Sequence, residues 1–111
     1  MRHLVILLGV AACDPAPVTI DQMPCPAAGT QLTYANFGAE FFASYCNRCH
    51  TRSQHGAPDT FHFDTLDQVH THLARIFVRA AGPNTTMPPG PDDPPMADRD
   101  QLAEWLACGS P

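Results

Sequence analysis

The segment Cys46-Asn47-Arg48-Cys49-His50 contains the residues of this chain whose types and spacing point most directly to chemistry. Two cysteines separated by two residues and followed at once by a histidine form the pattern that attaches c-type haem to a polypeptide. Each thiol adds across one vinyl group of the porphyrin, and the histidine coordinates the iron. We therefore predict one covalently attached haem c, held by Cys46, Cys49 and His50.

A Cys-x-x-Cys pair also occurs in two other kinds of site, thioredoxin-like redox motifs and zinc sites. A redox motif would stand in a βαβ pattern, which the sequence does not show. A zinc site would need a second pair of ligands. No second Cys-x-x-Cys is present, but His55 and His62 would complete a set of two cysteines and two histidines, so zinc stays open as the alternative to haem.

The N-terminal residues have the pattern of an export signal. A short basic head precedes an apolar run over residues 4–10, which is too short to span a bilayer as a permanent helix. Residues 10–13 read Val-Ala-Ala-Cys, which resembles the bacterial lipobox, where the cysteine is acylated. We expect residues 1–12 to be a lipoprotein signal peptide and Cys13 to be lipidated on the periplasmic side of a bacterial membrane. Ordinary secretory cleavage, with Cys13 left as a thiol, is the alternative.

The remaining cysteines predict a disulfide. The chain has five cysteines, and assigning two to haem and one to lipid leaves Cys25 and Cys108. Disulfides persist in exported proteins, and these two residues flank the first and the last expected helix. If those helices pack together, a Cys25–Cys108 bridge would tie the two ends of the folded chain.

The charge of the chain restricts its partners. The formal net charge is -5, and the six basic residues form no cluster, so nucleic acid is not an expected partner. A redox protein with a basic docking face would be the electrostatic match.

Three stretches have apolar residues at helical spacing, and none alternates convincingly enough to be a strand. The first expected helix covers residues 36–46, with Asn36 as its N-cap. The second covers residues 65–81, capped by Asp64 and ended by a Gly-Pro pair. The third begins near Asp98, with a glutamine placed three residues later for a capping box.

The chain is expected to have one folded part and one extended part. Residues 13–32 contain four prolines and little periodicity, which is typical of a tether. Residues 33–111 would form a single all-α domain. Its apolar core would be small, so a bound macrocycle would supply much of the interior.

The order of these elements resembles the class I c-type cytochrome domain, in its short lipoprotein form, over residues 33–107. A helix leads into the Cys-x-x-Cys-His segment and is followed by a middle helix, a Met-Pro loop and a last helix. The resemblance implies a small cytochrome c fold, with three main helices wrapped around one haem. It also implies that Gly38 and Phe42 meet Leu102 and Trp105, the glycine permitting close approach of two helices.

The resemblance also implies a distal haem ligand. Thr86-Met87-Pro88-Pro89 matches the ligand loop of that family, so Met87 is the expected second axial ligand, and Met96 is its main competitor. A methionine sulfur favours ferrous iron and raises the reduction potential. A bis-histidine haem is a different possibility, for which the candidate ligands are His55, His62, His70 and His72.

Other residues are expected to support the haem. A metal-bound imidazole usually donates its second N–H to a carbonyl or carboxylate. In the family a backbone carbonyl at a Gly/Pro turn does this, and residues 56–58 (Gly-Ala-Pro) are the local candidate for His50. Phe61 and Phe63 are expected to line the haem pocket.

These features predict an electron carrier rather than an enzyme. Two protein ligands would fill both axial positions of the iron, which leaves no position for a substrate. The expected partners are an electron donor and an electron acceptor, reached from a membrane anchor. Two alternatives are a haem-based gas or ligand sensor with a labile Met87, and an interaction module that docks its haem to a larger redox complex.

Overall fold

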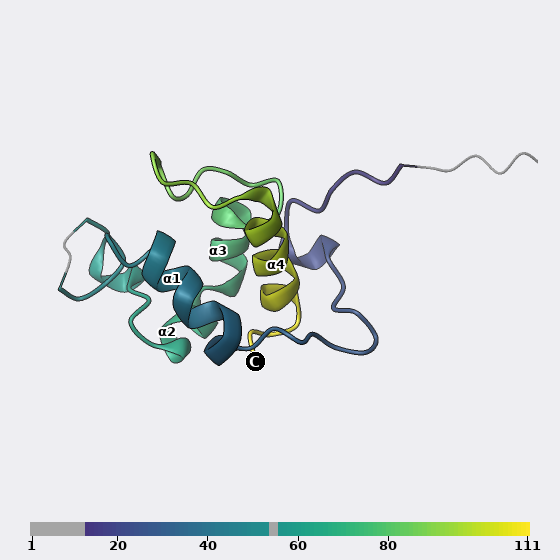
Figure 1. Ribbon diagram of the computed structural model, residues 1–111, viewed down its shortest axis with the longest axis horizontal. Helices are drawn as coiled ribbons and strands as arrows, with labels where there is room; N and C mark the ends of the chain where they lie inside the picture. The colour runs from purple at the N-terminus through teal and green to yellow at the C-terminus, as the bar shows by residue number, and fades with distance from the viewer. Residues whose placement is uncertain (1–12, 54–55) are drawn as a thin grey trace, which may run out of the picture.

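The computed structural model describes residues 13–53 and 56–111, so the predicted signal peptide and His55 lie outside the described residues. Its α-helices are α1 (Ala39–Tyr45), α2 (Leu66–Thr71), α3 (Leu73–Ala80) and α4 (Met96–Ala107) (Figure 1). The described residues contain no strand, which confirms the all-α prediction. None of the helices in this part of the chain is long and apolar enough to cross a membrane.

The first helix begins earlier than the sequence predicted, and Asn36 is not its cap. Thr33 caps a π-helical turn, Tyr34–Gly38, which leads directly into α1. The Thr33 hydroxyl accepts a hydrogen bond from the Asn36 N–H at 3.1 Å, and the Asn36 side chain accepts one from the Thr33 N–H at 2.7 Å. Asn36 is therefore the third residue of a capping box, whose first residue is Thr33.

The middle helix is two helices rather than the single one expected. The His72 N–H bonds to the Val69 carbonyl, three residues back, and this tight turn separates α2 from α3. Thr65 rather than Asp64 caps α2, in a second capping box with Gln68. Asp64 instead accepts a hydrogen bond from the backbone N–H of Arg52 at 3.0 Å.

The last helix also begins earlier than predicted. Its N-cap is Pro95, and the Asp98 N–H already bonds to the Pro95 carbonyl at 3.0 Å. The expected capping box at Asp98 was therefore wrong, because Asp98 lies inside the first turn. Proline has no N–H to lose and fits this end of a helix well.

The helix entering the Cys-x-x-Cys-His segment crosses the last helix at Gly38. A Cβ atom placed on Gly38 would lie 2.7 Å from Cζ2 of Trp105, so only glycine fits there. Phe42 packs next to it, with its ring 6.2 Å from that of Trp105. Trp105 is fully buried, and its contacts with Gly38 and Phe42 agree with that part of the expectation. Leu102 is fully buried in the same core.

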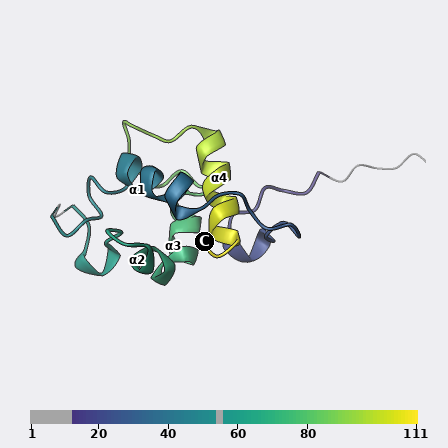
Figure 2. The ribbon, with the colours of Figure 1, turned by 60° about the horizontal axis from the view of Figure 1, so that its bottom comes forward.

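The rest of the core surrounds this crossing. The helices α3 and α4 lie side by side in two views (Figure 1, Figure 2). The buried apolar side chains come from all four helices and the segments between them: Phe41, Phe42, Phe63, Val69, Ile76, Phe77, Ala80, Ala81, Leu102, Ala103, Trp105 and Leu106.

The expected tether packs against the domain over much of its length. A short 3₁₀ turn, Ile20–Gln22, contacts α3 and α4, and Met23 packs against the core. Thr30 donates a hydrogen bond to the Glu104 carboxylate at 2.6 Å. Residues 13–16 are exposed and lead away from the helices (Figure 1). The rest of the segment packs on the helices through a few apolar side chains that show no helical period in the sequence: Ile20, Met23 and Leu32.

Cys25 and Cys108 meet where this segment passes the end of α4. Their sulfur atoms lie within bonding distance, and their Cα atoms are 4.8 Å apart, inside the range found in disulfides. The two residues are 83 positions apart in the sequence, so a bond here would enclose almost the whole domain.

Replacing Gly38 by alanine should destabilise the domain by about 1–3 kcal/mol, because the added methyl group overpacks the helix crossing. Denaturant unfolding of the haem-loaded protein measures this. In the double variant G38A/W105F the destabilisation should be smaller than the sum of the two single changes, since phenylalanine lacks the indole atoms that the new Cβ would meet. Strict additivity would contradict the close contact.

Removing the bridge in a C25A/C108A variant should lower the free energy of unfolding by about 2–5 kcal/mol, because the unfolded chain gains freedom. A thiol-reducing agent should lower the stability of the unaltered protein to a similar level and leave the variant unchanged. Equal thiol counts before and after reduction, with the haem still attached, would rule the disulfide out.

Candidate functional site

A cavity of about 1070 Å³ opens between the end of α1, the Cys46–His50 segment, α3 and the loop before α4. It is larger than ordinary small-molecule pockets, which span about 300–1,000 Å³. Its walls are mainly apolar, and the side chains that form them are Phe42, Phe61, Phe63, Ile76 and Ala80. Cys46, Cys49, His50 and Met87 all line this one cavity. The fold therefore brings the residues singled out by the sequence into one place.

The Cys-x-x-Cys-His segment continues the end of α1 as a tight turn. The N–H groups of Cys49 and His50 both bond to the Cys46 carbonyl, at 3.1 and 3.0 Å. Cys46 is half-buried and Cys49 is exposed at the cavity. Burial raises the pKa of the Cys46 thiol to about 12, and the positive charge of Arg99 opposes this rise. This pKa applies to the thiol before any group is attached to it.

The imidazole of His50 is held in a fixed orientation. Its Nδ1 lies 2.7 Å from the Phe61 carbonyl oxygen, which accepts a hydrogen bond from it. Its ring stacks on that of Phe63, with centroids 4.8 Å apart and planes at 21°. With Nδ1 carrying the hydrogen, Nε2 is the nitrogen left with a lone pair to bind a metal.

The prediction that residues 56–58 supply this carbonyl was wrong. The Ala57 N–H bonds to the Cys49 carbonyl instead, which ties that turn to the cysteine. The chain then makes a 3₁₀ turn, Asp59–Phe61, and this turn delivers the Phe61 carbonyl to His50. The sequence carries no clear signal for this turn, because three residues at this bend are too few to show periodicity.

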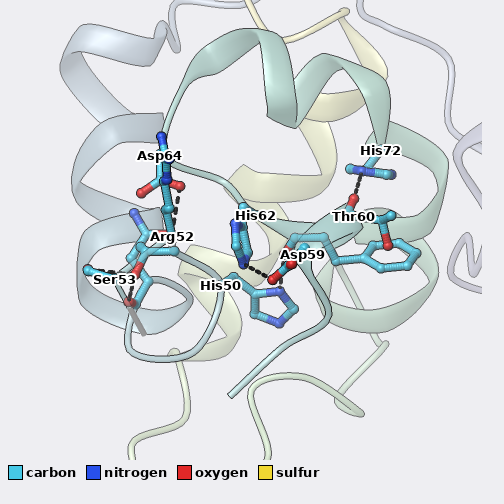
Figure 3. A network of polar contacts seen from close by, with 11 residues as sticks. His50, Arg52, Ser53, Asp59, Thr60, His62, Asp64 and His72 are labelled. Atoms are coloured by element: carbon cyan, nitrogen blue, oxygen red, sulfur yellow. Dashed lines mark hydrogen bonds and ion pairs between the residues drawn. The ribbon is translucent and has the colours of Figure 1, made fainter. Parts of the chain in front are cut away.

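The other described histidines are not among the residues that line the cavity. His62 is buried with its Nε2 3.8 Å from an Asp59 carboxylate oxygen, and His72 donates to the Thr60 carbonyl at 2.7 Å (Figure 3). His70 bonds to the Ser110 carbonyl. None of the three lines the cavity, so the geometry does not support them as haem ligands.

The zinc alternative finds no support either. Across residues 13–53 and 56–111, no group of three or more histidine, cysteine or acidic side chains is arranged to hold a metal ion. His62, one of the two histidines that the zinc set required, is directed at Asp59.

The loop between α3 and α4 places Met87, and not Met96, at the cavity. The Met87 N–H bonds to the Arg79 carbonyl at 2.8 Å, and its side chain is 38% exposed and lines the cavity. Met96 is 52% exposed in the first turn of α4 and does not line it.

The charged side chains that line the cavity are all arginines, and this was not foreseen. Among the residues that the structure describes, Arg48, Arg75 and Arg79 line it, and no acidic residue does. Arg48 pairs with Asp92 at 2.8 Å, but both are exposed, so the pair contributes less than about 1 kcal/mol. Arg75 and Arg79 both fall within the second expected helix, residues 65–81. That they are four residues apart, and hence neighbours on one face, was the available signal.

A buried arginine on α4 was missed entirely. Arg99 is 2% exposed, and its Nη1 atom lies within hydrogen-bonding distance of three backbone carbonyls, those of Ala80, Asn84 and Met87. It precedes Leu102 by three positions and Leu106 by seven, which is the spacing of the buried face. The helical period could therefore have identified it.

Most of the chain matches a known protein family. The family model described as cytochrome C oxidase, cbb3-type, subunit III matches residues 35–106, which is more than half of the chain. The match runs from the turn before α1 through most of α4 and contains the whole cavity lining. No match was found among curated proteins, and none among solved structures.

If His50 binds the haem iron, as the sequence predicts, replacing Phe63 by alanine should release it from the iron at higher pH than in the unaltered protein. The ring that supports the imidazole is lost, and an aromatic pair is worth about 0.5–1.5 kcal/mol, equivalent to a rise of about 0.5–1 pH unit in the acid midpoint. The spectrum of the ferric haem during acid titration reports the midpoint. Phe61→Ala is the matched control, because its ring stacks on His72 and its carbonyl is retained. Equal midpoints in all three proteins would contradict the role of Phe63.

Proposed function

The chain belongs to the cbb3-type cytochrome c oxidase subunit III family of c-type cytochrome domains, and we propose that it carries single electrons in an exported redox chain. Domains of this family bind haem c covalently and transfer electrons, and this chain therefore does so too. The proposal adds which residues hold the haem, where the protein is located and what kind of partner it meets.

We propose that Cys46 and Cys49 attach the haem and that His50 and Met87 bind its iron. The observation that supports this most strongly is that all four side chains line one cavity. The apolar wall suits a flat macrocycle, and the size of the cavity suits a ligand larger than ordinary metabolites. When bound there, the haem supplies a ferric/ferrous couple.

The residues of the chain prepare the site for electron transfer. The Phe61 carbonyl fixes the tautomer of His50, which keeps Nε2 available to the metal. Phe42, Phe63 and Ile76 exclude water, and a dry site disfavours the extra charge of ferric iron. Two protein ligands leave no position for a substrate, so the role is that of a carrier rather than of a classical enzyme.

Two arginines supply charges of the right sign for haem. Arg75 and Arg79 line the cavity from successive turns of α3. Guanidinium groups bind carboxylates in a bidentate manner, and a haem carries two propionates. We propose Arg75 and Arg79 as their partners.

The proposed location is the periplasmic side of a bacterial membrane, with Cys13 as the lipid-bearing residue. Two observations support an exported, anchored protein. Cys13 is exposed on a segment that leads away from the helices, and Cys25 and Cys108 are placed for a disulfide, which persists in exported proteins.

The proposed partners are a redox-protein donor and acceptor. The net charge of -5 favours a partner with a basic docking face. The arginines at the cavity would be offset there by the propionates, so the acidic surface that meets such a partner must include residues beside the cavity. Asp92 and Asp93, both exposed in the loop before α4, are suitably placed.

The substitution M87A tests the ligand set. It should abolish the weak red absorption band of methionine-ligated ferric haem and lower the reduction potential by at least about 60 mV, a tenfold change for one electron. The control M96A should retain both properties, because Met96 lies away from the cavity. Loss of the band in M96A instead would move the assignment to Met96.

Two further measurements on the unaltered protein test the function itself. A pyridine haemochrome spectrum after acid-acetone extraction should show haem that stays with the polypeptide, and loss of all colour would contradict covalent attachment. Rapid carbon monoxide binding by the ferrous protein at neutral pH would favour the ligand sensor. The observation that favours the ligand sensor as a second candidate is that the Met87 side chain is 38% exposed.

A further inference from the structure

The side chain of Arg99 is a buried charge without a counter-charge. Arg99 is 2% exposed and lies on the buried face of α4. It forms no ion pair with an acidic side chain of the described residues. Arginine is almost never fully buried unless it is paired. The helix position next to Leu102 and Leu106 would suit an aliphatic residue, so the guanidinium has a role that apolar packing cannot fill.

The partners of this guanidinium are three carbonyl oxygens from the connection between α3 and α4. They belong to Ala80, the last residue of α3, at 2.8 Å, to Asn84 at 2.9 Å and to Met87 at 2.8 Å. Because Nη1 carries two hydrogens, the three acceptors share them. The charge is thus solvated by the backbone of the segment that carries Met87.

These hydrogen bonds bracket the Met87 residue. The Met87 N–H bonds to the Arg79 carbonyl at 2.8 Å, and its carbonyl accepts from Arg99. The Gly82 N–H in turn bonds to the carbonyl of Arg99 at 2.9 Å. The Met87 loop has little regular structure of its own, so these contacts to α3 and α4 are what define where the Met87 side chain begins.

We propose that Arg99 is the positioning residue for Met87: it anchors the backbone that presents the thioether to the iron, and its buried positive charge favours the ferrous state. This inference rests on the proposed function, because it requires Met87 to be an iron ligand. A positive charge in a low-dielectric interior is weakly screened, and it disfavours the additional positive charge of ferric iron.

Three substitutions separate the two parts of the proposal. R99L removes charge and donors, R99Q keeps donors without charge, and R99K keeps the charge with a shorter reach. We expect R99L to lose most of the red absorption band, to have a lower potential, and to bind added imidazole in the ferric state about tenfold more tightly or more, as expected when hydrogen bonds from a charged donor are lost. R99Q should retain more of the band than R99L but have a low potential, and R99K should recover much of the potential. Because R99L removes a buried group, R99Q and R99K keep the test possible if R99L fails to fold.

The matched control is L102A, which weakens the same buried face of α4 but removes no charge and no hydrogen-bond donor, at a residue that does not line the cavity. It should lower the free energy of unfolding, as R99L does, but keep the red band, the potential and the imidazole affinity of the unaltered protein. If the Arg99 variants lose only stability and behave like L102A, Arg99 only stabilises the fold and the proposal is wrong. If the unaltered protein retains covalent haem but shows no methionine band, Met87 is not an iron ligand. The spectrum of the unaltered protein alone then overturns both the ligand assignment and the proposal for Arg99.

Discussion

The close approach of Trp105 on α4 to Gly38, immediately before α1, is the contact on which the other parts of this domain depend. A missing Cβ lets Trp105 lie against the backbone of the turn before α1. The Cys-x-x-Cys-His segment follows α1 directly, so the direction in which α1 leaves this crossing determines where both thiols and His50 lie. The attachment chemistry is thus positioned by a packing contact that involves none of the attaching residues.

The helix α4 connects three separate parts of the chain. Trp105 packs on Gly38 at the start of α1, Arg99 bonds to the loop that carries Met87, and Glu104 accepts a hydrogen bond from Thr30 in the N-terminal segment. Because the domain has few helices, one helix contacts all three of these parts. The cavity of the domain is correspondingly large for its core, which is the arrangement expected if a macrocycle completes the interior.

The all-α prediction, which rested on helical spacing, was confirmed, whereas the predicted N-terminal ends of the helices were wrong. The helical stretches were found correctly because the helical spacing of apolar residues extends over many positions and does not depend on any single residue. The caps of the first two helices each moved by a few residues or to a neighbour, because Thr33 and Thr65 compete with Asn36 and Asp64 for the same role. The break at His72 interrupts an apolar stripe that is continuous in the sequence, since two short helices can present the same face as one long helix. Residues expected to be a tether pack on the domain because their few apolar side chains find a surface that exists only in the folded state.

What the sequence alone determined is the chemistry that depends on spacing along the chain: two thiols and an imidazole within five residues, and an all-α pattern around them. Only the tertiary structure decided which methionine lies at the cavity, which carbonyl orients His50 and where the charge of Arg99 resides. These depend on distances between residues 11 to 38 positions apart, such as His50 with Phe61 and Cys49 with Met87. Chain connectivity sets no such distance until the helices have packed.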